Sequence, residues 1–288
     1  MRLLLGLIWL LHWLPLPILG RIGDGLGSLL YLIIGKRRRI ALTNLALCLP
    51  RLQEAERRVL ARRHFQAYTR SVLERGILWW APEARLRKLI HVEPGVPLEQ
   101  IQSGPTILLC PHFVCLDVAG VAVSLETSAC SIYMEQRNKV ADAALRRGRS
   151  RFHPVKLLSR AEGIKPILRA MREGIPYFML PDLDFGIKDA EFVPFFGIPA
   201  ATLTATARIA AATGAQVIPV ISTFLPGYRG WKVQFYPPVP DYPGKDLLEA
   251  TRRLNAFIED RVREAPAEYF WTHKRFKTRP PGEPGFYD

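Results

Sequence analysis

The stretch at residues 105–120, PTILLCPHFVCLDVAG, constrains the fold more than any other part of this 288-residue chain. Residues 106–110 are apolar without alternation and stop at Pro111, which is typical of a strand buried on both faces of a parallel sheet. His112 follows at once, Asp117 lies five positions further along, and the apolar spacing of a helix then begins. A histidine and a carboxylate where a strand passes into a helix are expected at the carboxyl edge of an open α/β sheet, the usual place for a site.

Other apolar runs alternate with helical patterns along the rest of the chain. Four more strands are predicted at residues 130–134, 175–180, 216–221 and 231–236, and the last alternates in polarity, which suits an edge strand. Helices are predicted at residues 52–80, 164–171, 201–213 and 247–262. Strands alternating with helices predict an α/β fold, an αβα sandwich with a largely parallel central sheet.

An apolar stretch at residues 3–20 has about the length that crosses a bilayer, although His12 and two prolines interrupt it. Only Arg2 precedes the stretch, whereas residues 36–39 read KRRR, so the positive-inside rule places the following chain in the cytoplasm. A signal peptide would have a more basic start and a small-residue cleavage site, and neither is found. We therefore predict an uncleaved N-terminal membrane-anchor helix, which spans the bilayer or lies in its interface.

The chain has a formal net charge of +14, which implies an anionic partner such as nucleic acid, a phospholipid surface, a phosphorylated substrate or an acidic carrier protein. The composition is 49% hydrophobic and the basic residues lie beside apolar runs, which favours a membrane surface. Residues 26–34 are too short to span and suit an interfacial helix. Residues 36–39 are expected to dock on anionic headgroups, each cation contributing roughly 1 kcal/mol. We therefore predict one domain, residues 36–288, preceded by a membrane anchor and interfacial segment at residues 1–35.

The chemistry of His112 suits a general base, because imidazole gains and loses a proton near neutral pH. On one regular helix His112 and Asp117 would lie about 140° apart, since an α-helix has 3.6 residues per turn. His112 must therefore lie in the turn before the helix if Asp117 is to hold one ring nitrogen and leave the other as base. The alternative is a structural histidine, and the spacing alone leaves both roles open.

Two further pairs of charged residues follow predicted elements. Arg149 and Arg151 can stabilise an oxyanion, hold a phosphate or bind an acidic carrier, or they can belong to a solvated basic face. Asp182 and Asp184 form a D-x-D pattern after a strand, which suits a divalent metal or, more simply, a turn.

No cofactor is predicted, because the chain has no Gly-rich loop to cradle the phosphates of a nucleotide. The four cysteines form no C-x-x-C pair, so we expect free thiols in a reducing compartment and no zinc site.

Six segments, in order along the chain, resemble the glycerolipid acyltransferase superfamily and, within it, the lipid A late acyltransferases (lauroyl and myristoyl acyltransferases). PHFVCLD, with His112 and Asp117, is similar to the H-x4-D/E motif of the superfamily. GRSRF, FMLPDLDFG and VIPVIS are similar to its second, third and fourth motifs. KRRRIALTNLALCLP and EYFWTHKRFKTRPPGEPGFYD resemble the flanks of the lipid A enzymes in particular. Position 117 is Asp, whereas many lipid A enzymes carry Glu there.

The resemblance implies roles for these residues. His112 would be the general base and Asp117 would orient it, while Arg149 or Arg151 and Asp182 or Asp184 would contact substrate. The implied reaction moves a fatty acyl chain from acyl carrier protein to a hydroxyl of a lipid A precursor, without an acyl-enzyme, on the cytoplasmic face of the bacterial inner membrane.

Three alternatives stay open from the sequence. The acceptor can be a lysophospholipid or another glycolipid, and the donor can be coenzyme A-bound. The chain can also be a non-catalytic basic binder of membranes or nucleic acid, but that reading leaves the strand-end positions of His112, Asp117 and Asp182 unexplained. We expect no nucleic-acid partner.

Overall fold

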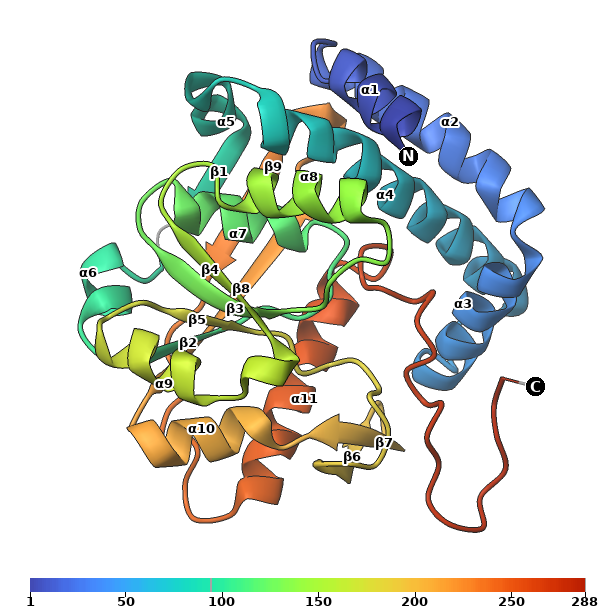
Figure 1. The fold of residues 1–288 in the computed structure, drawn as a ribbon. Helices are drawn as coiled ribbons and strands as arrows, with labels where there is room; N and C mark the ends of the chain where they lie inside the picture. The colour runs from blue at the N-terminus through green and yellow to red at the C-terminus, as the bar shows by residue number, and fades with distance from the viewer. Residues whose placement is uncertain (94, 288) are drawn as a thin grey trace.

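The computed structural model describes residues 1–93 and 95–287 and has a central sheet of seven strands (Figure 1). The strands are β1 (Ile90–Glu93), β2 (Thr106–Leu109), β3 (Ala129–Tyr133), β4 (Val155–Ser159), β5 (Tyr177–Met179), β8 (Gln216–Phe224) and β9 (Trp231–Phe235). Their order in the sheet is β1-β9-β8-β2-β5-β3-β4, and every neighbouring pair is parallel except β8 and β9. The predicted α/β fold with a largely parallel sheet is confirmed.

Helices and 3-10 turns connect the strands and cover the sheet. The N-terminal helices are α1 (Arg2–Leu11), α2 (Leu16–Ile33), α3 (Gly35–Cys48), α4 (Glu54–Trp80), α5 (Glu83–Leu89) and α6 (Leu98–Gln102). The later helices are α7 (Leu116–Ser124), α8 (Lys139–Arg149), α9 (Lys165–Arg172), α10 (Ala205–Thr213) and α11 (Leu247–Glu264), with 3-10 turns at Arg160–Glu162 and Pro226–Tyr228.

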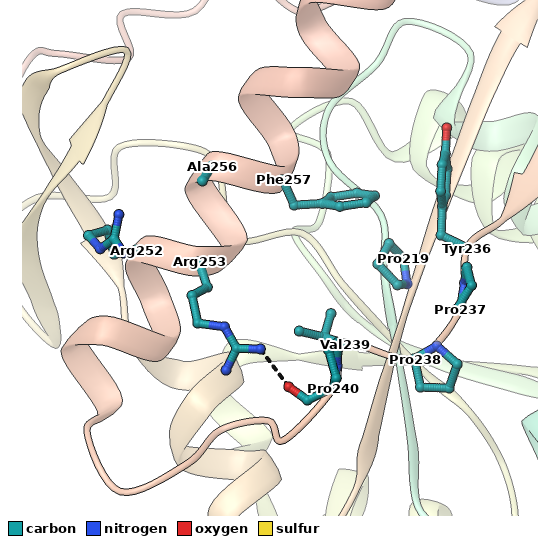
Figure 2. A pocket seen from close by; sticks show the side chains of 10 residues that line it. All are labelled: Pro219, Tyr236, Pro237, Pro238, Val239, Pro240, Arg252, Arg253, Ala256 and Phe257. Carbon is teal, nitrogen blue, oxygen red and sulfur yellow. Dashed lines mark hydrogen bonds between the residues drawn. The ribbon is translucent and has the colours of Figure 1, made fainter.

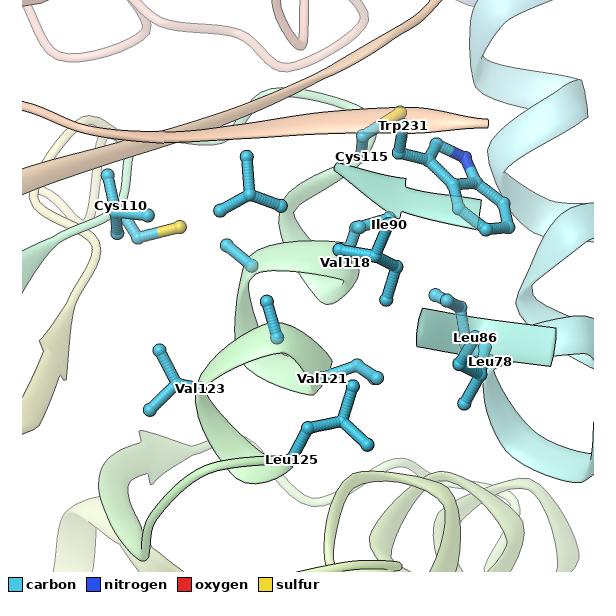
Figure 3. Packing of buried hydrophobic residues seen from close by; sticks show 14 of the residues in the cluster. Leu78, Leu86, Ile90, Cys110, Cys115, Val118, Val121, Val123, Leu125 and Trp231 are labelled. Carbon is cyan, nitrogen blue, oxygen red and sulfur yellow. The ribbon is translucent and has the colours of Figure 1, made fainter. Parts of the chain in front are cut away.

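The central strands are buried on both faces, because alternate side chains enter two different cores. Leu108 and Cys110 face the core around α7, which Figure 3 shows lying between the sheet and the α4–α5 region. Ile107 and Leu109 face the opposite core, together with Ile167 of α9 and residues of α10 and α11. This two-sided burial explains why the run at residues 106–110 has no polar alternation.

Two short strands at the edges of the sheet were absent from the prediction. β1 and β4 are largely half-buried or exposed and therefore lack a continuous apolar run. The prediction that residues 231–236 form an edge strand is wrong, since β1 pairs with β9 on its outer side.

A small hairpin, β6 (Ala190–Phe195) with β7 (Ile198–Leu203), replaces the first residues of the helix predicted from residue 201. Phe196 and Gly197 have φ angles of 51° and 78°, the left-handed pair that a tight hairpin turn requires. The helix, α10, begins at Ala205 and ends before Gly214, whose φ is 65°, as predicted for a glycine C-cap.

The predicted N-terminal apolar helix is confirmed, but its predicted position at residues 3–20 is wrong, because α1 ends at Leu11 and α2 begins at Leu16. Pro15 precedes α2 and Pro17 lies in its first turn, where the missing N–H of proline is tolerated while it would interrupt a continuous helix. Residues 26–34 are not a separate interfacial segment: residues 26–33 form the second half of α2. By length and composition, α2 is the one helix in the described part of the chain that could cross a bilayer.

α2 lies directly on α4 (Figure 1). Gly27 makes this close approach possible, because a Cβ atom there would lie 2.5 Å from the Cα of Gln66 and 2.6 Å from the carbonyl oxygen of Phe65. The outward face of α2 remains apolar and exposed, with Ile18, Leu26, Leu29, Leu32 and Ile33.

Candidate active site

Two adjacent strands of the sheet bring His112 and Asp182 together. β2 and β5 are parallel neighbours, and Leu109 pairs with Met179. His112 and Asp182 each lie three residues beyond that pair, so the shared register places both at the carboxyl edge of the sheet. Both belong to loops rather than helices, and the expectation that His112 lies outside the helix carrying Asp117 is confirmed, since α7 begins at Leu116.

The carboxylate of Asp182 holds His112 at two points. Its Oδ1 lies 2.7 Å from Nδ1 of the ring, and its Oδ2 accepts the backbone N–H of His112 at 2.9 Å. Asp182 is fully buried; burial raises its pKa, but the contact with His112 outweighs burial and holds the pKa below its ordinary value. An ionised carboxylate on Nδ1 selects the tautomer with hydrogen on that nitrogen and leaves the lone pair of Nε2 available.

The predicted hydrogen bond between Asp117 and His112 is therefore wrong. Asp117, in the first turn of α7, instead binds two arginines: its Oδ1 accepts Nε and Nη2 of Arg149 at 3.0 and 2.7 Å, and its Oδ2 lies 2.8 Å from Nε of Arg75. Burial raises the pKa of Asp117, but the two cations lower it by more than burial raises it, so the resulting pKa is about 2. The cause is geometric, because the turn from His112 points the ring towards β5 rather than over α7.

Arg75 is a member of this cluster that the sequence prediction missed. It lies near the end of α4, directly after Glu74, and the available signal was this charged pair within the otherwise apolar run VLERGILWW. Arg75 and Arg149 come from helices α4 and α8, and both are partly exposed beside the buried Asp117.

The other predicted substrate contacts, Arg151 and Asp184, are occupied by the protein itself. Arg151 donates to the carbonyl oxygens of Leu78 and Ala81 at the end of α4. The carboxylate of Asp184 accepts hydrogen bonds from Thr278 and from the backbone of Gly186. Arg149 and Asp182 therefore contact other predicted site residues, Asp117 and His112, whereas Arg151 and Asp184 connect segments of the chain.

A segment near residue 270 forms a wall of the site that the sequence prediction also missed. Phe270 donates its backbone N–H to the carbonyl of His112 at 3.0 Å, and its ring stacks on His112 with centroids 6.4 Å apart. The ring of Phe270 also stacks with the ring of His273. Burial lowers the pKa of His273 to about 4. His273 is thus neutral near pH 7, and its Nε2 accepts the N–H of Asp184.

A groove of 390 Å³ lies elsewhere, between the proline-rich segment after β9 and α11 (Figure 2). Arg253 and Arg252 line it, but Arg253 donates to the carbonyl of Pro240 and Arg252 is paired with Glu249. The six predicted site residues are not among its lining residues. All four cysteines are buried free thiols, as predicted. Among the described residues, no cluster of three or more His, Cys, Asp or Glu side chains is arranged to hold a metal ion.

Comparisons with known proteins agree along almost the whole chain. Residues 2–278 match the family model described as bacterial lipid A biosynthesis acyltransferase. The chain is 30% identical over 286 residues to a lipid A biosynthesis lauroyltransferase of Escherichia coli (strain K12), covering 98% of this chain and 93% of that protein. It is 30% identical to the palmitoleoyltransferase of the same organism, covering 98% and 92% of the two chains. It is 31% identical over 271 residues to the myristoyltransferase, covering 93% and 82%.

Proposed function

Because this chain belongs to the bacterial lipid A biosynthesis acyltransferase family, we propose that it transfers a fatty acyl chain from acyl carrier protein to a hydroxyl of a lipid A precursor. The observation that carries the proposed mechanism is the contact between Asp182 and Nδ1 of His112, which leaves Nε2 as the basic nitrogen. His112 is partly exposed while Asp182 is fully buried, so a substrate hydroxyl can reach the ring but not the carboxylate.

The proposed reaction is a direct transfer. Nε2 of His112 takes the proton of the acceptor hydroxyl, and the oxygen forms a bond to the thioester carbonyl carbon. The tetrahedral oxyanion then collapses, the carbon–sulfur bond breaks, and the leaving thiolate receives the proton from His112. Asp182 stabilises the imidazolium between these two proton transfers. Neither step requires an acyl-enzyme or a cofactor.

Arg149 is the residue that we propose to stabilise the oxyanion. A preorganised cation acts on the charge that develops in the transition state without having to reorganise. Asp117 fixes Arg149 through two hydrogen bonds and Arg75 through an ion pair, so its proposed role is to position these cations. This role replaces the orientation of His112 that the sequence motif implied.

The proposed location is the cytoplasmic face of the bacterial inner membrane. The exposed apolar face of α2 supports contact with hydrocarbon, and the basic residues 36–39 that follow it support a cytoplasmic orientation. Replacing Leu26, Leu29 and Leu32 by serine should release the protein from membranes in a flotation assay, whereas serine at the exposed Val59 of α4 should not.

Carrier protein is acidic, and α8 offers basic residues for it. Arg147 on the helix and Arg137 just before it are both exposed, and neither has an acidic partner in the described structure. Arg146 is instead paired with Asp142. The double variant R137E/R147E should raise the KM for the acylated carrier and leave kcat unchanged, because rim charges steer association. An unchanged KM would remove this surface from the carrier site, and equal use of acyl-coenzyme A would point to the other donor.

The decisive experiment is acyl transfer by H112A. Loss of a general base should lower kcat/KM by at least about 10²-fold with acylated carrier protein and a lipid A precursor. H91A is the control, because His91 is an exposed histidine on the edge strand β1. Full activity of H112A would overturn the mechanism. Mass spectrometry of lipid A and phospholipids from a deletion strain tests the acceptor: a change confined to phospholipids would mean a lysophospholipid acyltransferase.

A further inference from the structure

A second cavity, of 510 Å³, lies between α3 and the C-terminal segment and is separate from the site around His112. Lys36, Arg39 and Lys274 supply three cations to its lining, while Ile40 and Phe286 supply apolar surface. Its volume falls within the range of about 300–1,000 Å³ found for small-molecule sites. A cavity with cations on one part and apolar side chains on another suits a ligand that is itself anionic and apolar.

The four basic residues at positions 36–39 are divided by the fold into two pairs. Arg37 donates to the carbonyl of Thr272, and Arg38 donates to the carbonyls of Tyr31 and Leu32 at the end of α2. Lys36 and Arg39 line the cavity and, within the part of the chain that the structure describes, have no carboxylate within ion-pair distance. The sequence prediction treated all four as equivalent headgroup contacts, whereas in the structure Lys36 and Arg39 line the cavity and Arg37 and Arg38 donate to backbone carbonyls instead.

The third cation, Lys274, links the cavity to the active site. Lys274 has no carboxylate partner either among the described residues, and it lies over the ring of Tyr287. On α3, one helical turn after the cavity-lining Ile40, the side chain of Asn44 donates to the backbone carbonyls of Trp271 and His273, both at 2.7 Å. The same segment contains Phe270, whose backbone binds His112. Figure 1 shows α3 beside this returning segment.

We propose that this cavity binds a phosphate group of the lipid acceptor. Three cations without carboxylate partners match a phosphate, which accepts charge-assisted hydrogen bonds from Lys and Arg. The N-terminus of α3, at Gly35, adds the positive end of a helix dipole beside Lys36. The cavity is connected to the wall beside His112, because Lys274 and Phe270 lie in the same segment. A bulk membrane phospholipid would not require this connection, so the position favours the acceptor as the ligand. The assignment rests on the proposed acyl transfer to a lipid A precursor.

The test compares two acceptors and two sets of variants. The acceptors are a lipid A precursor with its phosphate groups and the same lipid after their enzymatic removal. The variants are K36A/R39A/K274A and the charge-matched control K165A/R169A/R172A, whose residues are exposed on α9. The first triple variant should raise the KM for the phosphorylated acceptor about tenfold or more, the effect of losing one hydrogen bond between charged groups, and leave the KM for the dephosphorylated lipid unchanged. R39E should act in the same direction.

Direct binding separates this proposal from the proposed reaction. Binding of the phosphorylated lipid in detergent micelles is measured with H112A, in which turnover is blocked, and with H112A carrying the triple substitution. Weaker binding in the second protein supports the phosphate site even if the wild-type protein transfers no acyl group. Equal binding, or an equal rise in KM for both lipids, would overturn it. Loss of binding to phosphatidylglycerol vesicles with unchanged KM for both acceptors would also overturn it, and would assign the cavity to the membrane surface.

Discussion

Asp182 binds His112 twice, through Nδ1 of the ring at 2.7 Å and through the backbone N–H at 2.9 Å. One buried carboxylate thus fixes both the position of the residue and the tautomer of its ring. Burial raises the pKa of the neighbouring Tyr269 and the carboxylate of Asp182 raises it further, so the phenol stays neutral. The contact follows from strand register and is independent of the five-residue spacing to Asp117.

The first prediction concerns Asp182 and its near neighbour Asp184. D182N keeps the shape of the side chain but removes the charge that stabilises the imidazolium, so kcat should fall about 10²–10⁴-fold. D184N, the matched control, loses one of the two oxygens that accept hydrogen bonds from Thr278, and should lower Tm while kcat changes less than threefold. Steady-state kinetics and thermal unfolding of both variants measure this. A larger loss of kcat in D184N than in D182N would contradict the assignment.

The second prediction separates Arg149 from Arg151. R149A removes the proposed oxyanion contact and should lower kcat about 10²–10³-fold with little change in the KM for the donor. R151A leaves two carbonyl oxygens of α4 without their cationic donor, and should cost about 2–3 kcal/mol in the free energy of unfolding. If R151A abolished turnover in a protein of unchanged stability, Arg151 would be the substrate contact.

The third prediction tests the packing of α2 on α4. G27L places a side chain where even a Cβ meets the backbone of α4 at 2.5 Å, so it should displace α2, lower Tm and expose the link to α3 to protease. G25L is the control on the same helix, because a Cβ at Gly25 meets nothing within 4 Å. Both substitutions change helix propensity equally. Equal Tm values for the two variants would show that α2 does not lie against α4.

The fourth prediction follows from Glu268, whose pKa burial raises to about 7. Between about pH 4.5 and 7 the unfolded chain releases this proton and the folded protein keeps it, so ionisation lowers stability as pH rises through that window. E268Q retains an acceptor for the N–H of Phe224. Its stability relative to wild type should therefore rise by roughly 1–3 kcal/mol from pH 4.5 to 7 and stay constant above.

E99Q is the control for that experiment, because Glu99 is exposed on α6. Denaturant unfolding at a series of pH values gives the difference directly, and effects of the buried histidines cancel because both proteins contain them. A difference that does not change with pH would mean that Glu268 ionises in the folded protein as it does in the unfolded chain.

The sequence predicted the central strands and the membership of the site better than its contacts. The runs at β2, β5 and β8 are apolar because both faces are buried, so periodicity located them. The edge strand β4 has no fully buried residue and gave no such signal. His112 and Asp182 were both expected at strand ends, but their contact depends on β2 lying beside β5, an order that no local pattern contains. The motif spacing favoured Asp117 instead.

The predicted bounds of the N-terminal helix were wrong for a different reason. Hydropathy registers how apolar residues 3–20 are, but Pro15 decides where a helix can begin. The exposed and buried faces of α2 are both rich in apolar or small residues, so composition alone could not show that half of the helix packs on α4.

The segment at residues 269–287 has a consequence for biosynthesis. It places Phe270 on His112, connects Thr278 to Asp184 and receives hydrogen bonds from Asn44 of α3, yet it follows every helix and strand that it joins. Domains begin to fold while the ribosome is still adding residues. The strands of the sheet can therefore begin to fold during translation before the ribosome has added Phe270, which contacts His112.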